Sequence, residues 1–221
     1  MFVGLPNLRD HDKYLNYLPS VLYHIKEQDC PVKVLKPYIT PSYSGKFHEG
    51  NKDKLLAITN RLNNIIDEFM KTDASHLWII DMDTEVPKHA LCTLLKLNAD
   101  IASGVYPFHN IRNSTMFGRT PSTEEYYFIP GTIDRLRGRV IGEEEMVSGG
   151  NGCMLIKRRV FQRYHPNIEP MRFTCPGGKG SDTYFWWRAQ KAGFTARIDG
   201  DVICGHLPEH SLIEMKKDFP P

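Results

Sequence analysis

The apolar residues of the first hundred positions follow two alternating patterns. Over 51–71 they recur every three or four residues, which is the spacing of an amphipathic helix. These positions are Leu55, Ile58, Leu62, Ile65, Ile66 and Phe69. Residues 76–80, His-Leu-Trp-Ile-Ile, are instead apolar without alternation. Such a run is typical of a central parallel strand that helices cover on both faces.

Other segments extend this alternation of strand and helix. Short apolar runs predict strands at Met1–Leu5, Val32–Leu35 and Ile101–Tyr106. Helical spacing predicts one helix near 15–25, which kinks or begins at Pro19, and another over 87–97. The order predicts an α/β fold with a mostly parallel central sheet, flanked by helices and joined by right-handed crossovers.

The second half of the chain has a different pattern, with glycine turns and no long helix between Ser114 and Ser148. The elements predicted there and beyond are strands at 126–129, 139–141, 153–156 and 201–204, and a helix over 181–192. The tail after Leu207 is polar and is expected to be mobile. A chain of 221 residues predicts one domain. We divide it into an α/β half at 1–106, a second half at 107–207 and a tail at 208–221.

Composition narrows the class of protein. With 41% hydrophobic and 24% charged residues, the chain falls in the ordinary globular range. A net charge of +2, with basic residues interspersed among acids, disfavours a protein that coats nucleic acid through a basic face. Apolar runs fall far short of the roughly 20 residues of a transmembrane segment. With no signal peptide at the start and five widely spaced cysteines that suggest reduced thiols, we expect a cytoplasmic protein.

Asp81 and Asp83 directly follow the apolar run of 76–80. In an extended chain, side chains two residues apart point to the same side, roughly 6 to 7 Å apart. Ligands of open α/β sheets bind beyond the carboxyl ends of the strands. Two carboxylates in that place suit Mg²⁺ or Mn²⁺ bridging a diphosphate. The alternative is that both acids only cap the helix that starts near Pro87.

Two further residues are candidates for the same edge of the sheet. His206 follows an apolar strand, and imidazole beside carboxylates suits Mn²⁺, although a lone histidine is otherwise an ordinary hydrogen-bonded residue. Asp182 lies at the start of the helix over 181–192, after the glycine-rich segment Pro176–Gly180. It is either an acid that stabilises the helix N-terminus or a general base reached through a mobile loop.

Neither glycine-rich segment carries a nucleotide-binding signature. Pro176–Gly180 is no P-loop, because Lys179 is followed by glycine rather than by Ser or Thr. Ser148–Gly152 does not match the dinucleotide fingerprint, and its glycines allow close approach to a ligand or a tight turn. Trp186 and Trp187 could stack on a sugar, but at least one of them is expected in the core.

Four segments, in order and over most of the chain, resemble the family 2-like glycosyltransferases of the GT-A type. That fold is the Rossmann-like nucleotide-diphospho-sugar transferase fold. The segments are Gly4-Leu5-Pro6, then 76–83 (HLWIIDMD), then 149–156 (GGNGCMLI) with 158–161 (RRVF), and last 181–185 (SDTYF) through Gly193-Phe194 to 204–207 (CGHL). The resemblance implies a metal-dependent glycosyltransferase that uses a nucleoside diphosphate-sugar, such as a UDP- or GDP-sugar. The acceptor hydroxyl belongs to a glycan, a lipid or a protein that the sequence does not specify.

The resemblance also implies roles for single residues. Asp81 contacts the ribose or the metal, Asp83 ligates Mn²⁺ or Mg²⁺ directly, and His206 completes the metal shell. The residues expected at the nucleotide-sugar are Pro6, Arg61, Asp81, Gly149 and Gly150. Asp182 matches the acid of the family's Glu-Asp pair, which is the catalytic base in inverting members, while Ser181 stands where the family usually has Glu.

Two other classes of protein remain open. Nucleotidyl transfer also uses paired carboxylates on an α/β sheet, but it gives His206 no obvious role and does not predict Asp182 behind a glycine loop. A non-catalytic module that binds a nucleotide-sugar or a glycan is compatible with the same fold, because function resides in the site.

Overall fold

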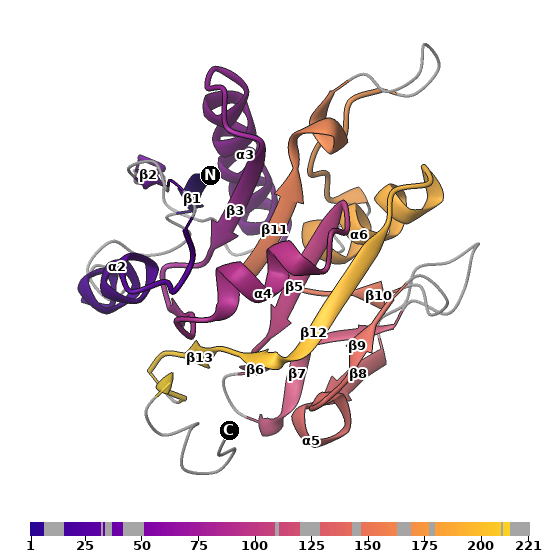
Figure 1. Cartoon of the computed structure of the whole chain (residues 1–221). Coiled ribbons are helices and arrows are strands. Elements are labelled where there is room, and N and C mark those ends of the chain that lie inside the picture. The colour runs from indigo at the N-terminus through magenta and orange to yellow at the C-terminus, as the bar shows by residue number, and fades with distance from the viewer. Residues whose placement is uncertain are drawn as a thin grey trace.

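A seven-stranded sheet, in the order β2-β1-β3-β11-β5-β12-β9, forms the centre of the computed structural model (Figure 1). The strands are β1 Phe2–Leu5, β2 Tyr38–Ile39, β3 His76–Ile80, β5 Ile101–Val105, β9 Val140–Ile141, β11 Cys153–Lys157 and β12 Ala196–Ile203. The structure describes residues 1–6, 16–31, 33, 37–41, 51–108, 111–119, 129–142, 147–162, 169–176, 180–208 and 210–212.

The sheet is mixed, which corrects the prediction of a mostly parallel one. Strand β1 runs parallel to β2 and β3, and β5 runs parallel to β12. Strand β11, however, is antiparallel to both β3 and β5, and β9 is antiparallel to β12. A parallel connection needs a crossover, usually a helix. Between β5 and β11 the described chain instead forms short strands and the four-residue helix α5, Ile133–Leu136, so β11 enters the sheet reversed.

Helices cover both faces of this sheet. Helices α3, Asn51–Met70, and α6, Ser181–Lys191, pack on one face, while α2, Leu18–Lys26, and α4, Ala90–Lys96, pack on the other. Strand β3 contributes alternate side chains to the two hydrophobic cores, and its residues 77–80 are fully buried. The predicted central strand, covered on both faces, is confirmed.

The second half of the chain builds a smaller sheet with the order β10-β7-β6, in which β8 also pairs with β7 (Figure 1). Its strands are β6 Pro107–Phe108, β7 Ile111–Arg119, β8 Ile129–Thr132 and β10 Val147–Ser148. This confirms the predicted change to short strands. The predicted piece at 126–129 lies outside the described residues except for Ile129, which begins β8.

Several element boundaries differ from the predictions. Helix α2 begins at Leu18 with Pro19 in its first turn, so the proline starts this helix rather than kinking it. The strand beside β1 is β2, whereas the strand predicted at Val32–Leu35 lies mostly outside the described residues. Helix α4 is shorter than the predicted 87–97. None of the described helices has the length and apolar composition needed to cross a membrane.

The cysteines are all free thiols, as the sequence suggested. Cys153 and Cys204 are fully buried among the apolar side chains of the core that α2 and α4 cover, and the other three are half-buried.

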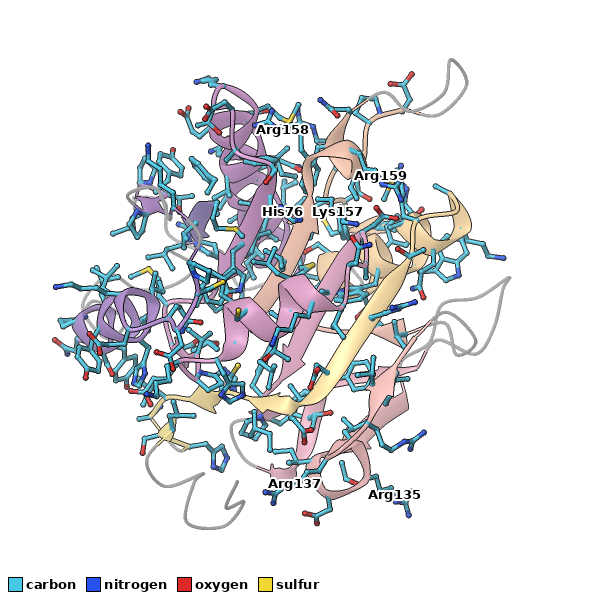
Figure 2. The ribbon with its side chains drawn as sticks, in the orientation of Figure 1. His76, Arg135, Arg137, Lys157, Arg158 and Arg159 are labelled. Carbon is cyan, nitrogen blue, oxygen red and sulfur yellow. The ribbon has the colours of Figure 1, made fainter. Side chains whose placement is uncertain are left out.

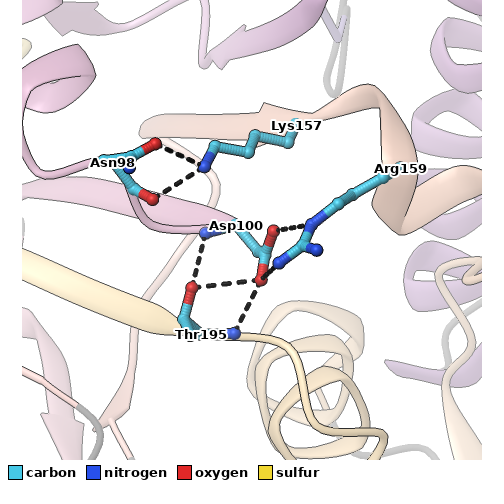
Figure 3. A network of polar contacts seen from close by, with 5 residues as sticks. All are labelled: Asn98, Asp100, Lys157, Arg159 and Thr195. Carbon is cyan, nitrogen blue, oxygen red and sulfur yellow. Dashed lines mark hydrogen bonds and ion pairs between the residues drawn. The ribbon is translucent and has the colours of Figure 1, made fainter.

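A polar network fixes the edge of the sheet where β5 begins (Figure 3). The fully buried carboxylate of Asp100 accepts hydrogen bonds from the Arg159 guanidinium, from Thr195 N at 2.9 Å and from Thr195 Oγ1 at 3.0 Å. Lys157 Nζ donates to the backbone and side-chain oxygens of Asn98, both at 2.7 Å. These contacts tie β5, β11 and β12 together at their shared end.

Basic side chains gather at the same edge, where Figure 2 shows His76 near 157–159. Arg158 donates to the carbonyl oxygens of Phe69, Thr72 and Ala74 at 3.1, 2.7 and 2.7 Å. These are carbonyls at and just beyond the C-terminal end of α3, where a cation satisfies free acceptors. The Arg158 cation therefore has a structural role, as does the Arg159 ion pair at the same edge.

Candidate functional site

The candidate site lies at the opposite edge, where β3, β5 and β12 end (Figure 1). Asp81 directly follows β3, and the Thr84 N–H donates to the Asp81 carbonyl oxygen at 3.0 Å. The triplet Asp81-Met82-Asp83 is therefore a tight turn rather than an extended chain. This corrects the spacing argument, because residues in a turn do not have the strand geometry that makes side chains two residues apart point to the same side.

A two-stranded ladder brings His206 to this turn. Strand β4, Thr84–Glu85, pairs antiparallel with β13, Gly205–His206, so that His206 lies opposite Thr84. The Leu207 N–H also donates to the Asp83 carbonyl oxygen at 2.8 Å. The prediction that His206 arrives at the same edge as the carboxylates is confirmed.

Asp83 and His206 face each other across this ladder. His206 Nε2 lies 3.7 Å from Asp83 Oδ1, and the two side chains are 8% and 12% exposed. His206 Nδ1 lies 2.7 Å from the Pro107 carbonyl oxygen. Because a carbonyl can only accept, Nδ1 carries the hydrogen, and the lone pair of a neutral imidazole is left on Nε2, toward Asp83. A metal-ligating histidine is typically held in this way by a backbone carbonyl.

The pair has the chemistry of a partial metal site. A divalent cation about 2.1 Å from each ligand fits between atoms that are 3.7 Å apart. When the imidazole is protonated, the same two groups form an ion pair instead. Within the described part of the chain, no group of three or more His, Cys, Asp or Glu side chains could hold a metal. A cation here would need further ligands from water or from a bound phosphate, as Mg²⁺ sites commonly have.

Tyr106, which the sequence reasoning missed, lies where the predicted residues converge. It follows β5, is 3% exposed, and its hydroxyl accepts a hydrogen bond from the Gly152 N–H at 2.8 Å. Its ring meets the His206 ring edge-on, with centroids 5.3 Å apart. The sequence did offer one signal for Tyr106, because it directly follows β5 at the end of the sheet where Asp81 follows β3.

The electrostatics of Tyr106 report on the carboxylates around it. Burial raises the pKa of Tyr106 well above its ordinary value. The charges of Asp81, Asp182 and Asp83 raise this pKa further, against the opposing hydrogen bond from Gly152. Three predicted site carboxylates from two elements therefore act on one buried phenol. Negative charge gathered in this way is a setting in which a cation is stabilised.

Asp182 is the second residue of α6 and is partly buried. Its Oδ1 accepts a hydrogen bond from the Thr183 N–H at 2.8 Å, and burial raises the pKa of its carboxyl group in spite of that bond. The N-cap residue Gly180 offers no side chain to the helix. Asp182 thus both satisfies a first-turn N–H and has the raised pKa of a stronger base, so the geometry is compatible with both interpretations.

Of the glycines in the turn between β10 and β11, Gly152 has a steric reason, whereas a side chain at Gly149 would make only ordinary contacts. A Cβ on Gly149 would lie 3.4 Å from Trp186 Cζ2, and one on Gly152 would lie 2.6 Å from Tyr106 Cζ. Gly150 is buried between them. The roles of Gly149 and Gly150 at a nucleotide-sugar remain predictions. Residues 177–179 of the second glycine-rich segment lie outside the described residues.

Four buried polar atoms around this turn have no hydrogen-bond partner among the described residues. They are Thr84 Oγ1, Ser148 Oγ, Asn151 Oδ1 and Trp186 Nε1. Buried polar groups in proteins are nearly always satisfied, by protein, water or ligand. These atoms lie beside the carboxylates, so this turn is the candidate place for a bound water or polar ligand.

The remaining predicted residues are placed as follows. Pro6 directly follows β1 and is buried, and Arg61 is 6% exposed in α3, one turn before Ile65, which packs closely on Gly4 of β1. Their contacts with a nucleotide remain predictions. Trp186 is fully buried, which confirms that one tryptophan belongs to the core.

Helix α6 also contains Trp187, the second tryptophan considered for sugar stacking, and Ser181, which precedes the predicted base Asp182. Trp187 is half-buried and stacks on Tyr184 with centroids 5.6 Å apart. Ser181, in the position of the expected Glu, is buried as the first residue of α6.

Comparison with models of known protein families found no match, and a search of curated proteins found no relative of this chain. What is shown is an α/β fold with a mixed seven-stranded sheet packed against helices.

Proposed function

We propose that this protein is a metal-dependent glycosyltransferase of the GT-A type, which transfers a sugar from a UDP- or GDP-sugar to an acceptor hydroxyl. The observation that carries the proposal is the Asp83–His206 pair, a carboxylate oxygen 3.7 Å from an imidazole nitrogen whose tautomer is set by Pro107. It lies at the sheet edge where ligands of α/β proteins bind.

Asp83 Oδ1 and His206 Nε2 would hold Mn²⁺ or Mg²⁺, with Asp81 beside them. The bound cation supplies electrostatic stabilisation of the charge that develops on the departing diphosphate. With few protein ligands, most of the coordination is left to phosphate oxygens and water, which is the usual arrangement for a cation that binds with its nucleotide.

Asp182 is the proposed catalytic base. Its carboxylate takes the proton of the acceptor hydroxyl while the acceptor oxygen bonds to the anomeric carbon. The bond from that carbon to the diphosphate breaks, and its electron pair leaves with the diphosphate. The raised pKa of Asp182 favours this role, because proton transfer is most effective when the pKa of the base approaches the working pH. The proposal includes inversion at the anomeric carbon.

The turn at Ser148–Gly152 is the proposed place of the donor. The unsatisfied polar atoms around it offer donors and acceptors to a hydroxyl-rich ligand. The hydrogen bond from the Gly152 N–H to the Tyr106 hydroxyl holds this turn against the end of β5.

A screen of UDP-, GDP-, ADP- and dTDP-sugars, each with Mn²⁺ and with Mg²⁺, tests the function. A ligand that binds the native state raises its stability by mass action, by about 2.7 kcal/mol at a concentration of 100 Kd. We expect one nucleotide class to raise the melting temperature only when metal is present, with slow release of free sugar. Release of pyrophosphate would show nucleotidyl transfer instead. Tight metal-dependent binding without turnover across many acceptors would indicate a binding module.

A further inference from the structure

Glu85 is a buried acid at the candidate site to which the proposed chemistry gives no role. It is 6% exposed and lies opposite Gly205 in the β4–β13 ladder. Its Oε1 accepts a hydrogen bond from the Ser20 hydroxyl of α2 and lies 3.8 Å from His24 Nε2. Its Oε2 accepts the Leu212 N–H at 2.7 Å. One carboxylate thus contacts a helix from the start of the chain and a segment near its end.

The segment that reaches Glu85 folds back onto the ladder. The His206 N–H donates to the His210 carbonyl oxygen at 2.6 Å, and the His210 N–H donates to the His206 carbonyl oxygen at 2.9 Å. Gly205 permits this return, because a Cβ there would lie 2.5 Å from Leu212 N and 3.1 Å from Glu85 Oε2. His210 and Leu212 are both buried. Residues 210–212, within the predicted tail, therefore pack onto the ladder, while mobility of the tail stays a prediction.

We propose that Glu85 is a positioning residue for the metal site formed by Asp83 and His206. Its carboxylate fastens α2 and residues 210–212 to β4, and so holds the ladder on which the two ligands face each other. The inference rests on the proposed function for the metal itself. A carboxylate that accepts several hydrogen bonds makes stronger contacts than a neutral group does. Metal ligands need such support, since small displacements of a ligand lower affinity.

Glu85→Gln is the direct test, since it keeps the size and one acceptor oxygen but cannot accept from both segments. We expect its affinity for Mn²⁺ alone, measured by titration calorimetry, to fall about 10- to 100-fold, the range typical of groups that support metal ligands. We also expect amide hydrogen exchange to become faster in 205–212 than in the rest of the sheet.

Asp100→Asn is the matched control. It makes the same kind of change in another buried acid, at the opposite edge of the sheet. It should lower the overall stability yet leave the Mn²⁺ affinity unchanged. Amide hydrogen exchange in 205–212 should then be no faster than in the rest of the sheet. A purely structural role for Glu85 would make the two variants alike.

Two further variants keep the test decisive if Glu85→Gln folds poorly. Ser20→Ala releases only α2 from the carboxylate, so the loss of Mn²⁺ affinity should be smaller. Gly205→Ala pushes Leu212 away from the ladder, so the loss should be at least as large as in Glu85→Gln.

The outcomes separate the inference from the proposed function. If the unmodified protein binds Mn²⁺ and Glu85→Gln or, where that does not fold, Gly205→Ala binds it equally well, the positioning role is overturned alone. Equal losses in Asp100→Asn and Glu85→Gln also overturn it. If the unmodified protein binds no Mn²⁺, with or without a nucleoside diphosphate, the metal site and the proposed function fall together.

Discussion

The hydrogen bond between His206 Nδ1 and the Pro107 oxygen decides what His206 can do. It leaves Nε2 as the nitrogen that faces Asp83, and in a neutral imidazole of this tautomer Nε2 has a lone pair that can bind a cation but no hydrogen to donate. In the proposed site, Asp83 would supply the negative charge that neutralises the cation, and His206 would supply one neutral ligand atom with a fixed orientation. Loss of the carboxylate should therefore be the more damaging change.

Asp83→Ala is expected to abolish metal-dependent binding of a nucleoside diphosphate, because it removes both a ligand and the compensating charge. His206→Ala should weaken metal binding less. Isothermal titration with and without Mn²⁺ measures both effects. The exposed acid Asp73 provides the control, since Asp73→Ala should change nothing. Unchanged metal-dependent affinity in a folded Asp83→Ala variant would remove the proposed site.

Asp182→Asn is expected to spare donor binding and to lower transfer by about 10²- to 10⁴-fold, because the amide cannot take a proton. Asn can still accept the hydrogen bond from the Thr183 N–H. If Asp182 only stabilises the helix start, the transfer rate should instead stay within a few-fold of normal. Donor affinity and transfer rate, measured on the same variant, distinguish the two roles.

The same variant has an expected signature in stability against pH. Burial raises the pKa of Asp182 in the folded protein, so the folded state favours the protonated acid. Above this pKa the ionised carboxylate lowers the free energy of unfolding, and below the unfolded pKa of about 3.9 that penalty disappears. Asp182→Asn should therefore be more stable than the unmodified protein at pH 7, with a difference that shrinks on acidification. Urea unfolding at several pH values measures it, and a variant less stable at pH 7 would contradict the assignment.

Tyr106→Phe tests the residue on which the carboxylates converge. The substitution keeps the ring but leaves the buried Gly152 N–H without its acceptor, which should cost about 1–3 kcal/mol in the free energy of unfolding. Tyr23→Phe, at a tyrosine that is 59% exposed, should cost nothing measurable. Equal denaturant midpoints for the two variants would show that the Tyr106 hydroxyl does not hold the turn.

Among the elements, the turn at Ser148–Gly152 has a tight steric requirement at Gly152. Gly152→Ala would place a methyl group 2.6 Å from Tyr106 Cζ and 2.8 Å from Thr84 Oγ1, so backbone or ring must move. We expect a loss of about 1–3 kcal/mol in the free energy of unfolding, as in overpacked cores. Gly142→Ala is the control, because its Cβ would meet only ordinary contacts at 3.6 Å or more. Urea unfolding of both variants tests the difference, and a Gly152→Ala variant as stable as Gly142→Ala would contradict it.

The sequence predicted elements where one residue pattern suffices. Helix α3 and strand β3 have strong periodicity or a continuous apolar run, and both form where expected. The antiparallel direction of β11 depends on the path of the chain between β5 and β11. The five residues of β11 carry no information about that path. The two-residue strands β4 and β13 carry no pattern at all. They exist because tertiary packing brings them together.

The candidate site was predictable in part for the same reason. Asp83 and His206 each follow a strand at one edge of the sheet, and that rule brought them together correctly. The rule failed for the local shape of 81–83, because a turn and an extended end have the same sequence signal. Glu85 has no signature in the chain, and Tyr106 has only its position at the end of a strand, since the significance of both lies in contacts with segments far away in the sequence.

For the whole molecule, buried acids at opposite edges of the sheet have opposite effects on stability. Burial alone would raise the pKa of Asp100, but hydrogen bonds from Arg159 and Thr195 outweigh it and lower the pKa. Asp100 therefore stabilises the fold above the unfolded pKa of about 3.9, and that contribution is lost as the pH falls through its lowered folded pKa. Asp182, at the candidate site, lowers stability at neutral pH.

Asp100→Asn should accordingly lower the free energy of unfolding at pH 7 by about 1–3 kcal/mol, because a buried carboxylate that accepts several hydrogen bonds is replaced, while the Arg159 partner is 47% exposed and stays hydrated. The difference from the unmodified protein should shrink in acid. Chemical unfolding at pH 7 and at about pH 3 measures both values, and a constant difference would contradict the pKa assignment.

The β4–β13 ladder also has a consequence for the order in which the protein becomes functional during synthesis. Strand β4 is made well before its partner β13, which is followed by the segment that fastens it. A nascent chain can assemble β1, β3, β5 and β11 before His206 has left the ribosome, because none of these strands needs it. The proposed cation site would therefore be completed only after these strands. Chains that terminate before β13 would then keep much of the sheet but lack the proposed metal site.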